Sequence, residues 1–199
     1  MAIDAGASAL GLVGSMPSGP GVIEDETIAR IAQAVPPPVA TFLLTSETAV
    51  DLIVEHHRRT LTSTIQLVDA LADGWYSELK RKLPAIKIVQ AVHVRDDKTV
   101  EEAVRVSEHA DALLLDSGDP GREVKVLGGT GRTHDWSLSR AIVERSRVPV
   151  YLAGGLNAGN VREALDAVRP FGLDVCSGVR TDGRLDPAKL AAFMAAAGA

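Results

Sequence analysis

Short apolar runs recur along the chain at a nearly regular interval, and a segment with helical periodicity follows almost every one. The runs are rich in Ala, Val, Leu and Ile and lack polar alternation, which is typical of strands buried on both faces of a parallel sheet. Seven strands are expected, starting near residues 9, 39, 63, 87, 110, 148 and 172, with separations of 30, 24, 24, 23, 38 and 24 residues. Alternation at this spacing predicts repeated right-handed βα units.

Capping residues mark where several of the predicted helices begin. Asp186 before Pro187 predicts the start of a last helix. Asn160 is placed to cap the helix before it, and Thr45 or Ser46 to cap a helix near the start of the chain. These signals support the alternation of strands and helices.

Two architectures contain such units, a doubly wound open sheet and a (β/α)8 barrel. The open sheet usually has a Gly-x-Gly-x-x-Gly turn after its first strand, and the sequence has none there. The barrel binds phosphate in the loops after its last two strands, where this chain has Gly154-Gly155 and Ser177-Gly178. We therefore predict an α/β fold of the (β/α)8 TIM-barrel type with seven strands evident, as one domain over residues 1–199. Because residues 1–6 resemble the end of a helix, we expect that the first βα unit is missing from this sequence.

The composition and net charge of the chain exclude some classes of function. Hydrophobic residues make up 46% and charged residues 24% of the chain, as in a soluble globular protein. The net charge of −5 argues against a nucleic-acid partner, so an anionic ligand would need local donors. No apolar run approaches the roughly 20 residues of a membrane span. The first residues lack the basic and then apolar segments of a signal peptide, so none is expected. The single cysteine, Cys176, excludes an intramolecular disulfide and fits a reducing cytoplasm.

Two glycine turns, at Gly154-Gly155 and at Ser177-Gly178, follow successive predicted strands. Glycine lets backbone N–H groups approach an anion closely, so paired turns predict a phosphate site. Each glycine alone is equally consistent with an ordinary turn, and the pairing favours the functional interpretation.

Two acids and one long connection are further candidates. Asp116 ends an apolar strand, so it points into the catalytic mouth of a barrel or caps its own loop. Asp174, inside the last predicted strand, faces the mouth or forms an ion pair. The segment from Ser117 to His134 is too long for a simple connection, and Gly128 to Gly131 within it suggest a mobile lid or a flexible surface loop.

The cysteine and the histidines are not expected to take part in catalysis or metal binding. Cys176 lies within the last predicted strand and is expected to be an inert hydrophobe. His56 and His57 are expected in solvent, His93 to face the barrel interior, and His134 to adjoin the long connection. No spacing of His, Cys and carboxylates predicts a metal site, and no Gly-x-x-x-x-Gly-Lys-Ser/Thr run is present.

Several segments resemble phosphoribosylanthranilate isomerases of tryptophan biosynthesis, specifically from about residue 110 onward and more loosely before it. The segments are Asp116-Ser117, Gly128 to Trp136 (GGTGRTHDW), Leu152 to Asn157 (LAGGLN), Asn160-Val161 and Asp174 to Val179 (DVCSGV). The resemblance implies an aldose-ketose isomerase, an intramolecular oxidoreductase that acts on the phosphosugar N-(5′-phosphoribosyl)anthranilate. Its product is 1-(2-carboxyphenylamino)-1-deoxyribulose 5-phosphate, and no metal or organic cofactor takes part. We expect a cytoplasmic monomer or homodimer.

The resemblance also implies roles for residues. Asp116 matches the general acid that opens the ribose ring, and Asp174 matches an acid near the sugar hydroxyls and amine. The phosphate cradle matches Gly154, Gly155, Ser177 and Gly178. The substrate-covering loop matches Gly129, Gly131 and Arg132.

Departures from the family pattern leave alternatives open. The family's general base, a cysteine in a Lys-x-Cys-Gly motif, has no counterpart in this sequence, and Cys176 stands where serine is usual. Val68 replaces a histidine, the loop from Ser15 to Gly21 lacks an arginine, and Arg180 replaces a glutamate. One alternative is a non-catalytic or altered phosphosugar-binding barrel that has lost the base. Another is an isomerase or lyase for a related sugar phosphate that uses Asp116 and Asp174.

Overall fold

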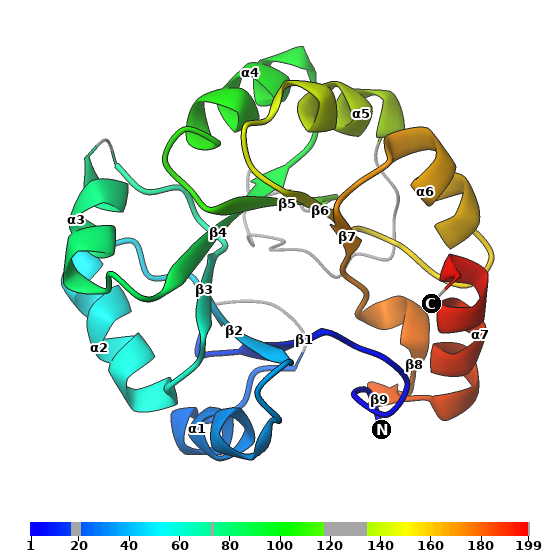
Figure 1. Cartoon of the computed structure of the whole chain (residues 1–199), viewed down its shortest axis with the longest axis horizontal. Helices are drawn as coiled ribbons and strands as arrows, with labels where there is room; N and C mark the ends of the chain where they lie inside the picture. The colour runs from blue at the N-terminus through cyan, green and yellow to red at the C-terminus, as the bar shows by residue number, and fades with distance from the viewer. Residues whose placement is uncertain (17–20, 73, 118–134, 199) are drawn as a thin grey trace.

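The fold is built on a parallel sheet whose strand order follows the chain. The computed structural model describes residues 1–16, 21–72, 74–117 and 135–198. Its strands are β1 (Ala9–Val13), β2 (Ala40–Thr45), β3 (Thr64–Leu67), β4 (Lys87–His93), β5 (Ala112–Asp116), β6 (Val150–Leu152) and β7 (Gly172–Leu173). Each strand pairs in parallel with the next, from β1 to β7. The sheet curls around a central axis and carries its helices on the outside, as Figure 1 shows.

The helices alternate with the strands as predicted. They are α1 (Asp25–Ala34), α2 (Val50–Thr60), α3 (Trp75–Lys82), α4 (Asp97–Val106), α5 (Trp136–Arg145), α6 (Val161–Val168) and α7 (Pro187–Ala197). A short 3-10 helix, η1 (Ser177–Val179), and a hairpin of β8 (Arg180–Thr181) and β9 (Arg184–Leu185) precede α7. The α/β fold of the TIM-barrel type with seven strands is thus confirmed. Over the described ranges, the helices are too short or too polar to cross a membrane.

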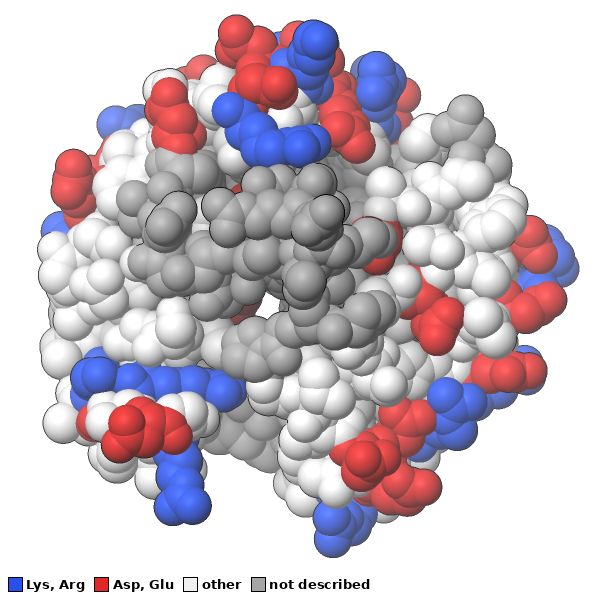
Figure 2. Space-filling model, turned by 180° about the vertical axis from the view of Figure 1, so that it is seen from behind, with Lys and Arg blue, Asp and Glu red and all other residues white. Residues whose placement is uncertain are grey.

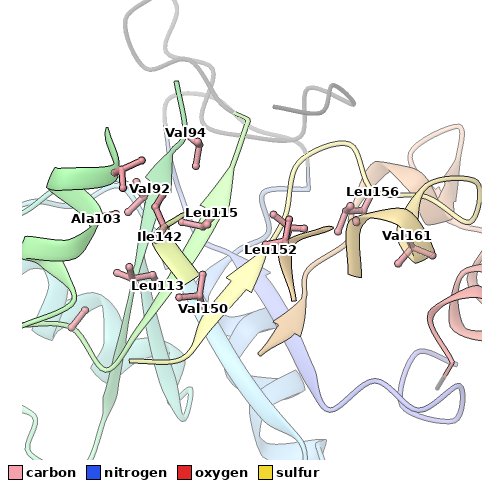
Figure 3. Packing of buried hydrophobic residues seen from close by; sticks show 14 of the residues in the cluster. Val92, Val94, Ala103, Leu113, Leu115, Ile142, Val150, Leu152, Leu156 and Val161 are labelled. Atoms are coloured by element: carbon pink, nitrogen blue, oxygen red, sulfur yellow. The ribbon is translucent and has the colours of Figure 1, made fainter. Parts of the chain in front are cut away.

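Both faces of the sheet are buried, which accounts for the unbroken apolar runs in the sequence. Between β4 to β6 and the helices α4 to α6 lies the cluster shown in Figure 3. Its members include Val92, Leu113, Leu115, Val150 and Leu152 from the strands and Ala103, Ile142 and Val161 from the helices. A second cluster, the inner cluster, fills the side toward the barrel axis. It consists of Val89, Ala91, Ala112, Leu114 and Ala153, with Phe42 and Tyr151 packed against it.

The inner cluster identifies the side chains that face the barrel axis at the carboxyl ends of the strands. Val89 and Ala91 of β4 and Ala112 and Leu114 of β5 belong to it, and the next positions in the alternation are His93 and Asp116. These two residues are also direct partners in the β4–β5 register. His93, as predicted, faces the barrel interior.

The last strand is shorter than predicted. Because β7 ends at Leu173, Asp174 and Cys176 follow the strand and do not lie within it. The Asp174 N–H still continues the ladder by donating to the Leu152 carbonyl (2.9 Å). The chain then turns into η1, with Cys176 as its N-cap residue.

The predicted cap at Thr45 or Ser46 is wrong. β2 extends through Thr45, and α2 begins only at Val50, after Ala49. The Thr45 hydroxyl instead accepts the Glu47 N–H at 3.2 Å. The local capping signal is therefore used in the turn between β2 and α2.

His56 and His57 are buried, contrary to the prediction. His56 is 3% exposed, and its two ring nitrogens lie 3.1 Å from Thr45 Oγ1 and 3.0 Å from Asp25 Oδ1. His57 Nε2 lies 2.8 Å from the Thr62 carbonyl oxygen. Asp25, the partner of His56 in α1, is distant in the sequence. The charged residues that surround the two histidines in the sequence therefore predicted a helix face in solvent.

Candidate active site

A pocket opens at the carboxyl ends of β5, β6 and β7. Its lining comes from the end of β5, the turn after β6 and the segment between β7 and η1. The lining residues are Asp116, Ala153, Gly154, Gly155, Leu156, Asp174, Val175, Cys176 and Ser177. The structure therefore brings both predicted acids together with the predicted phosphate-binding turns. Figure 2 shows the reverse face to that of Figure 1, and acidic side chains are visible there at the central opening.

The two glycine turns touch each other through their backbones. A Cβ atom on Gly178 would lie 1.9 Å from the Leu156 carbonyl oxygen, so only glycine fits at this position. Gly154 has a φ of +86°, and a Cβ atom there would lie 2.9 Å from the Ser117 nitrogen. These contacts join the chain after β5, β6 and β7 into one compact unit.

Two asparagines hold the first turn in place. The side-chain amides of Asn157 and Asn160 donate to the Gly155 carbonyl at 3.2 and 3.0 Å. Asn160 Oδ1 also accepts the Asn157 N–H at 2.9 Å. Asn160 is the N-cap residue of α6, as predicted, but its side chain forms no capping hydrogen bond. Its amide braces the glycine turn instead.

Backbone donors at the two turns are available for an anion. Within the described ranges, no acceptor is found for the N–H groups of Gly154, Gly155, Ser177 and Gly178. Clustered, unpaired N–H groups of this kind bind phosphate without requiring a basic surface. They are the local donors that a chain of net charge −5 needs for an anionic ligand.

Asp116 and Asp174 place two carboxyl groups in the same pocket. Asp116 is 8% exposed, and its Oδ1 accepts the Ser117 N–H at 2.7 Å. Asp174 is exposed to the pocket, yet desolvation by the surrounding protein and, second, the charge of Asp116 together raise its pKa to about 6. Such a pair can retain a proton close to neutral pH, as general acid chemistry requires.

Replacing Asp174 by Asn should stabilise the protein above about pH 6 and have little effect near pH 4. The pKa of this carboxyl is raised from 3.8 to about 6, so the folded chain binds the proton more tightly than the unfolded chain. Stability therefore falls as the pH rises through this interval, and Asn removes the loss. Because water reaches Asp174, the gain should be smaller than the shift alone implies.

The measurement is the Tm of both proteins from about pH 4 to about pH 8. Glu163→Gln, which removes a charge from the exposed face of α6, serves as the control. A difference between wild type and Asp174→Asn that stays constant across this range would contradict the prediction.

Cys176 has the properties of an unreactive thiol. Burial raises its pKa; Arg180 opposes this rise, and Asp174 and Asp116 add to it. The thiol is therefore protonated at neutral pH, in line with the inert role expected from the sequence.

Two residues at the pocket's margin were not among the predicted site residues. The two terminal nitrogens of Arg180 lie 3.5 and 3.8 Å from the place that a Cβ of Gly21 would take, and Arg180 forms no ion pair in the described residues. His93 lies beside Asp116 across the β4–β5 register. The available signals were the position of Arg180 directly after the Ser-Gly-Val turn and the alternation that turns His93 inward.

Three predicted substrate-binding residues, Gly129, Gly131 and Arg132, lie outside the described residues, as do Gly128 and His134. Across the part of the chain that the structure does describe, no three His, Cys, Asp or Glu side chains are grouped as metal ligands.

Comparison with known proteins gives a consistent result. A family model described as N-(5′-phosphoribosyl)anthranilate (PRA) isomerase matches residues 2–196. The N-(5′-phosphoribosyl)anthranilate isomerase of Halorubrum lacusprofundi is 40% identical and aligns with 99% of this chain and 89% of its own length. That of Methanocella arvoryzae is 33% identical over 90% of this chain and 82% of its own length.

Solved structures agree with the sequence comparisons. Phosphoribosyl anthranilate isomerase from Thermotoga maritima superimposes with a TM-score of 0.83 and 30% identity, over 99% of this chain and 91% of that one. A second structure of such an isomerase, at a TM-score of 0.80 and 28% identity over 99% and 90% of the chains, holds reduced 1-(o-carboxyphenylamino)-1-deoxyribulose 5-phosphate.

Proposed function

We propose how this chain, which belongs to the N-(5′-phosphoribosyl)anthranilate isomerase family, binds and converts its substrate. The reaction is the Amadori-type isomerisation of N-(5′-phosphoribosyl)anthranilate in tryptophan biosynthesis. The observation that carries the assignment of residues is that one pocket contains Asp116, Asp174 and residues of both glycine turns.

The glycine turns form the phosphate half of the site. The unpaired N–H groups of Gly154, Gly155, Ser177 and Gly178 donate to the phosphate oxygens. The turns touch through Gly178 and are braced by the asparagine amides, so the donors are fixed before the ligand arrives. Arg180 adds a positive charge at the margin of an otherwise acidic pocket.

Asp116 is the general acid of the other half. It donates its proton to the ribose ring oxygen; the bond from that oxygen to C1 breaks, and the nitrogen lone pair forms a C=N bond. Asp174, the more exposed acid of the same pocket and partly protonated near neutral pH, contacts the sugar hydroxyls and amine and limits the charge around Asp116. We assign removal of the C2 proton to none of the described residues.

The remaining assignments concern the setting of the enzyme. We propose a cytoplasmic enzyme that is a monomer or a homodimer, with the phosphosugar as its small-molecule partner and without nucleic acid or membrane as partners. The single cysteine and the net charge of −5 support these assignments.

Two measurements on the purified chain test the function. The first is consumption of N-(5′-phosphoribosyl)anthranilate, followed by its fluorescence. The second is calorimetric binding of reduced 1-(o-carboxyphenylamino)-1-deoxyribulose 5-phosphate. Binding with turnover supports the proposal, whereas binding without turnover indicates the non-catalytic phosphosugar-binding barrel. Absence of both overturns the assignment of this pocket.

A further inference from the structure

His93 occupies the inward face of the barrel mouth beside the proposed acid. It is the last residue of β4 and the register partner of Asp116 on β5. The inner cluster of Val89, Ala91 and their neighbours ends just before it, so the imidazole begins the polar layer above the apolar interior.

Both ring nitrogens of His93 are buried and have no hydrogen-bond partner among the described residues. Buried polar groups in folded proteins nearly always have a partner, and an unpaired one opposes folding. By contrast, Gln90, buried on the same strand β4, donates to the Leu67 carbonyl. In the part of the chain that the structure describes, His57 Nδ1 and Trp136 Nε1 are unpaired as well, but on His93 both nitrogens lack a partner and the residue pairs with Asp116 of the pocket. This combination points to a partner that arrives with the ligand.

The surroundings of His93 identify the chemical group that fits. Burial lowers the pKa of the imidazole; the charge of Asp116, the nearby backbone of Val68 and the charge of Asp69 oppose this lowering, and Arg95 adds to it. The Val68 backbone is close enough to act on the ring but forms no hydrogen bond of normal geometry with either nitrogen. The ring is neutral, so one nitrogen donates a hydrogen bond and the other accepts one. A hydroxyl group can do both, whereas a carboxylate or phosphate only accepts and would be repelled by the two aspartates.

We propose that His93 is a specificity-determining residue of the substrate site, where its imidazole hydrogen-bonds a sugar hydroxyl of the substrate. The proposal rests on the proposed function in that the sugar belongs to the phosphosugar held by the glycine turns. The contact places the sugar against Asp116, one strand away, and satisfies two nitrogens that have no hydrogen-bond partner among the described residues.

Binding measurements on two variants test the proposal. In His93→Phe the ring shape is kept and the hydrogen bonds are lost, so affinity for the reduced product analogue should fall about 10-fold. In His93→Gln, a side chain that can donate and accept remains, and affinity should stay within about 3-fold of wild type. Affinity for inorganic phosphate should be unchanged in both. His109→Phe, on the outer side of the barrel where His109 stacks on Tyr76, is the matched control.

The Tm of His93→Phe gives a second measurement. A histidine with a purely structural role would lower the Tm when it is replaced. Removing an orphaned polar group should leave the Tm of His93→Phe equal to or above that of wild type. A lower Tm with unchanged affinity would show that His93 serves packing and would overturn the proposal.

A second probe, ribulose 5-phosphate, separates this proposal from the proposed function. If wild type binds the reduced product analogue and His93→Phe binds it equally well, the inference about His93 fails and the function stands. If wild type binds only ribulose 5-phosphate, and His93→Phe weakens that binding, the isomerase assignment fails and the hydroxyl contact stands. If wild type binds neither sugar phosphate, both are overturned.

Discussion

Replacing Asp116 by Asn should lower kcat by about 10²- to 10⁴-fold, the usual contribution of a positioned general acid. The amide is the same size as the carboxyl group and can still accept the Ser117 N–H, which Asp116 Oδ1 accepts at 2.7 Å. The fold and the pocket should therefore be retained. The amide of the variant has no proton acidic enough to be transferred to the ribose ring oxygen.

Binding and turnover together isolate this role. Affinity for the reduced product analogue should change by less than about 3-fold, because a single neutral substitution removes no phosphate donor. Asp166→Asn, on the exposed side of α6 where Asp166 faces Arg162, provides a control with the same chemical change. Turnover by Asp116→Asn at the wild-type rate would remove Asp116 from the mechanism.

Gly178→Ala should disrupt the phosphate half of the site more than the addition of a methyl group at any other position. The new Cβ would lie 1.9 Å from the Leu156 carbonyl oxygen and 3.1 Å from the Asn157 Cα, and both of these are backbone atoms that cannot rotate away. The two turns must separate, which spreads the four N–H donors. We expect a loss of about 1–3 kcal/mol in the free energy of unfolding and at least about 10-fold weaker binding of ribulose 5-phosphate.

Urea unfolding and calorimetric binding measure these two effects. Gly11→Ala is the matched control, because its Cβ would lie at an ordinary 3.4 Å from Leu44 Cδ1 and its φ is not positive. The control should bind ribulose 5-phosphate as wild type does. Equal affinity in Gly178→Ala would mean that the contact between the turns does not hold the phosphate donors.

Sequence signals that act over a few residues predicted the structure well. Asp186 and Pro187 start α7 as expected, and the Asp186 side chain accepts the N–H groups of Ala188 and Lys189. The apolar run that was predicted to end at Asp116 forms β5, which ends at that residue. The paired glycine turns were predictable because only glycine tolerates such close approach of two backbone segments. The structural requirement therefore fixes the residue type in the sequence.

Features that depend on distant partners were not predictable in this way. The burial of His56 requires Asp25 from α1, and no local pattern encodes that contact. The β8–β9 hairpin was missed although Asp182-Gly183, both at positive φ, is a typical two-residue turn signal. The orphaned nitrogens of His93 could not be inferred at all, since a missing partner is a property of the assembled mouth.

The match between strand order and chain order has a consequence for how the protein assembles. Each strand from β2 to β7 pairs with the strand that was synthesised just before it. Loop closure between such neighbours costs less entropy than closure between strands far apart in the chain. A chain leaving the ribosome can therefore add one βα unit at a time to a growing sheet, and its newest strand always finds its neighbour already in place.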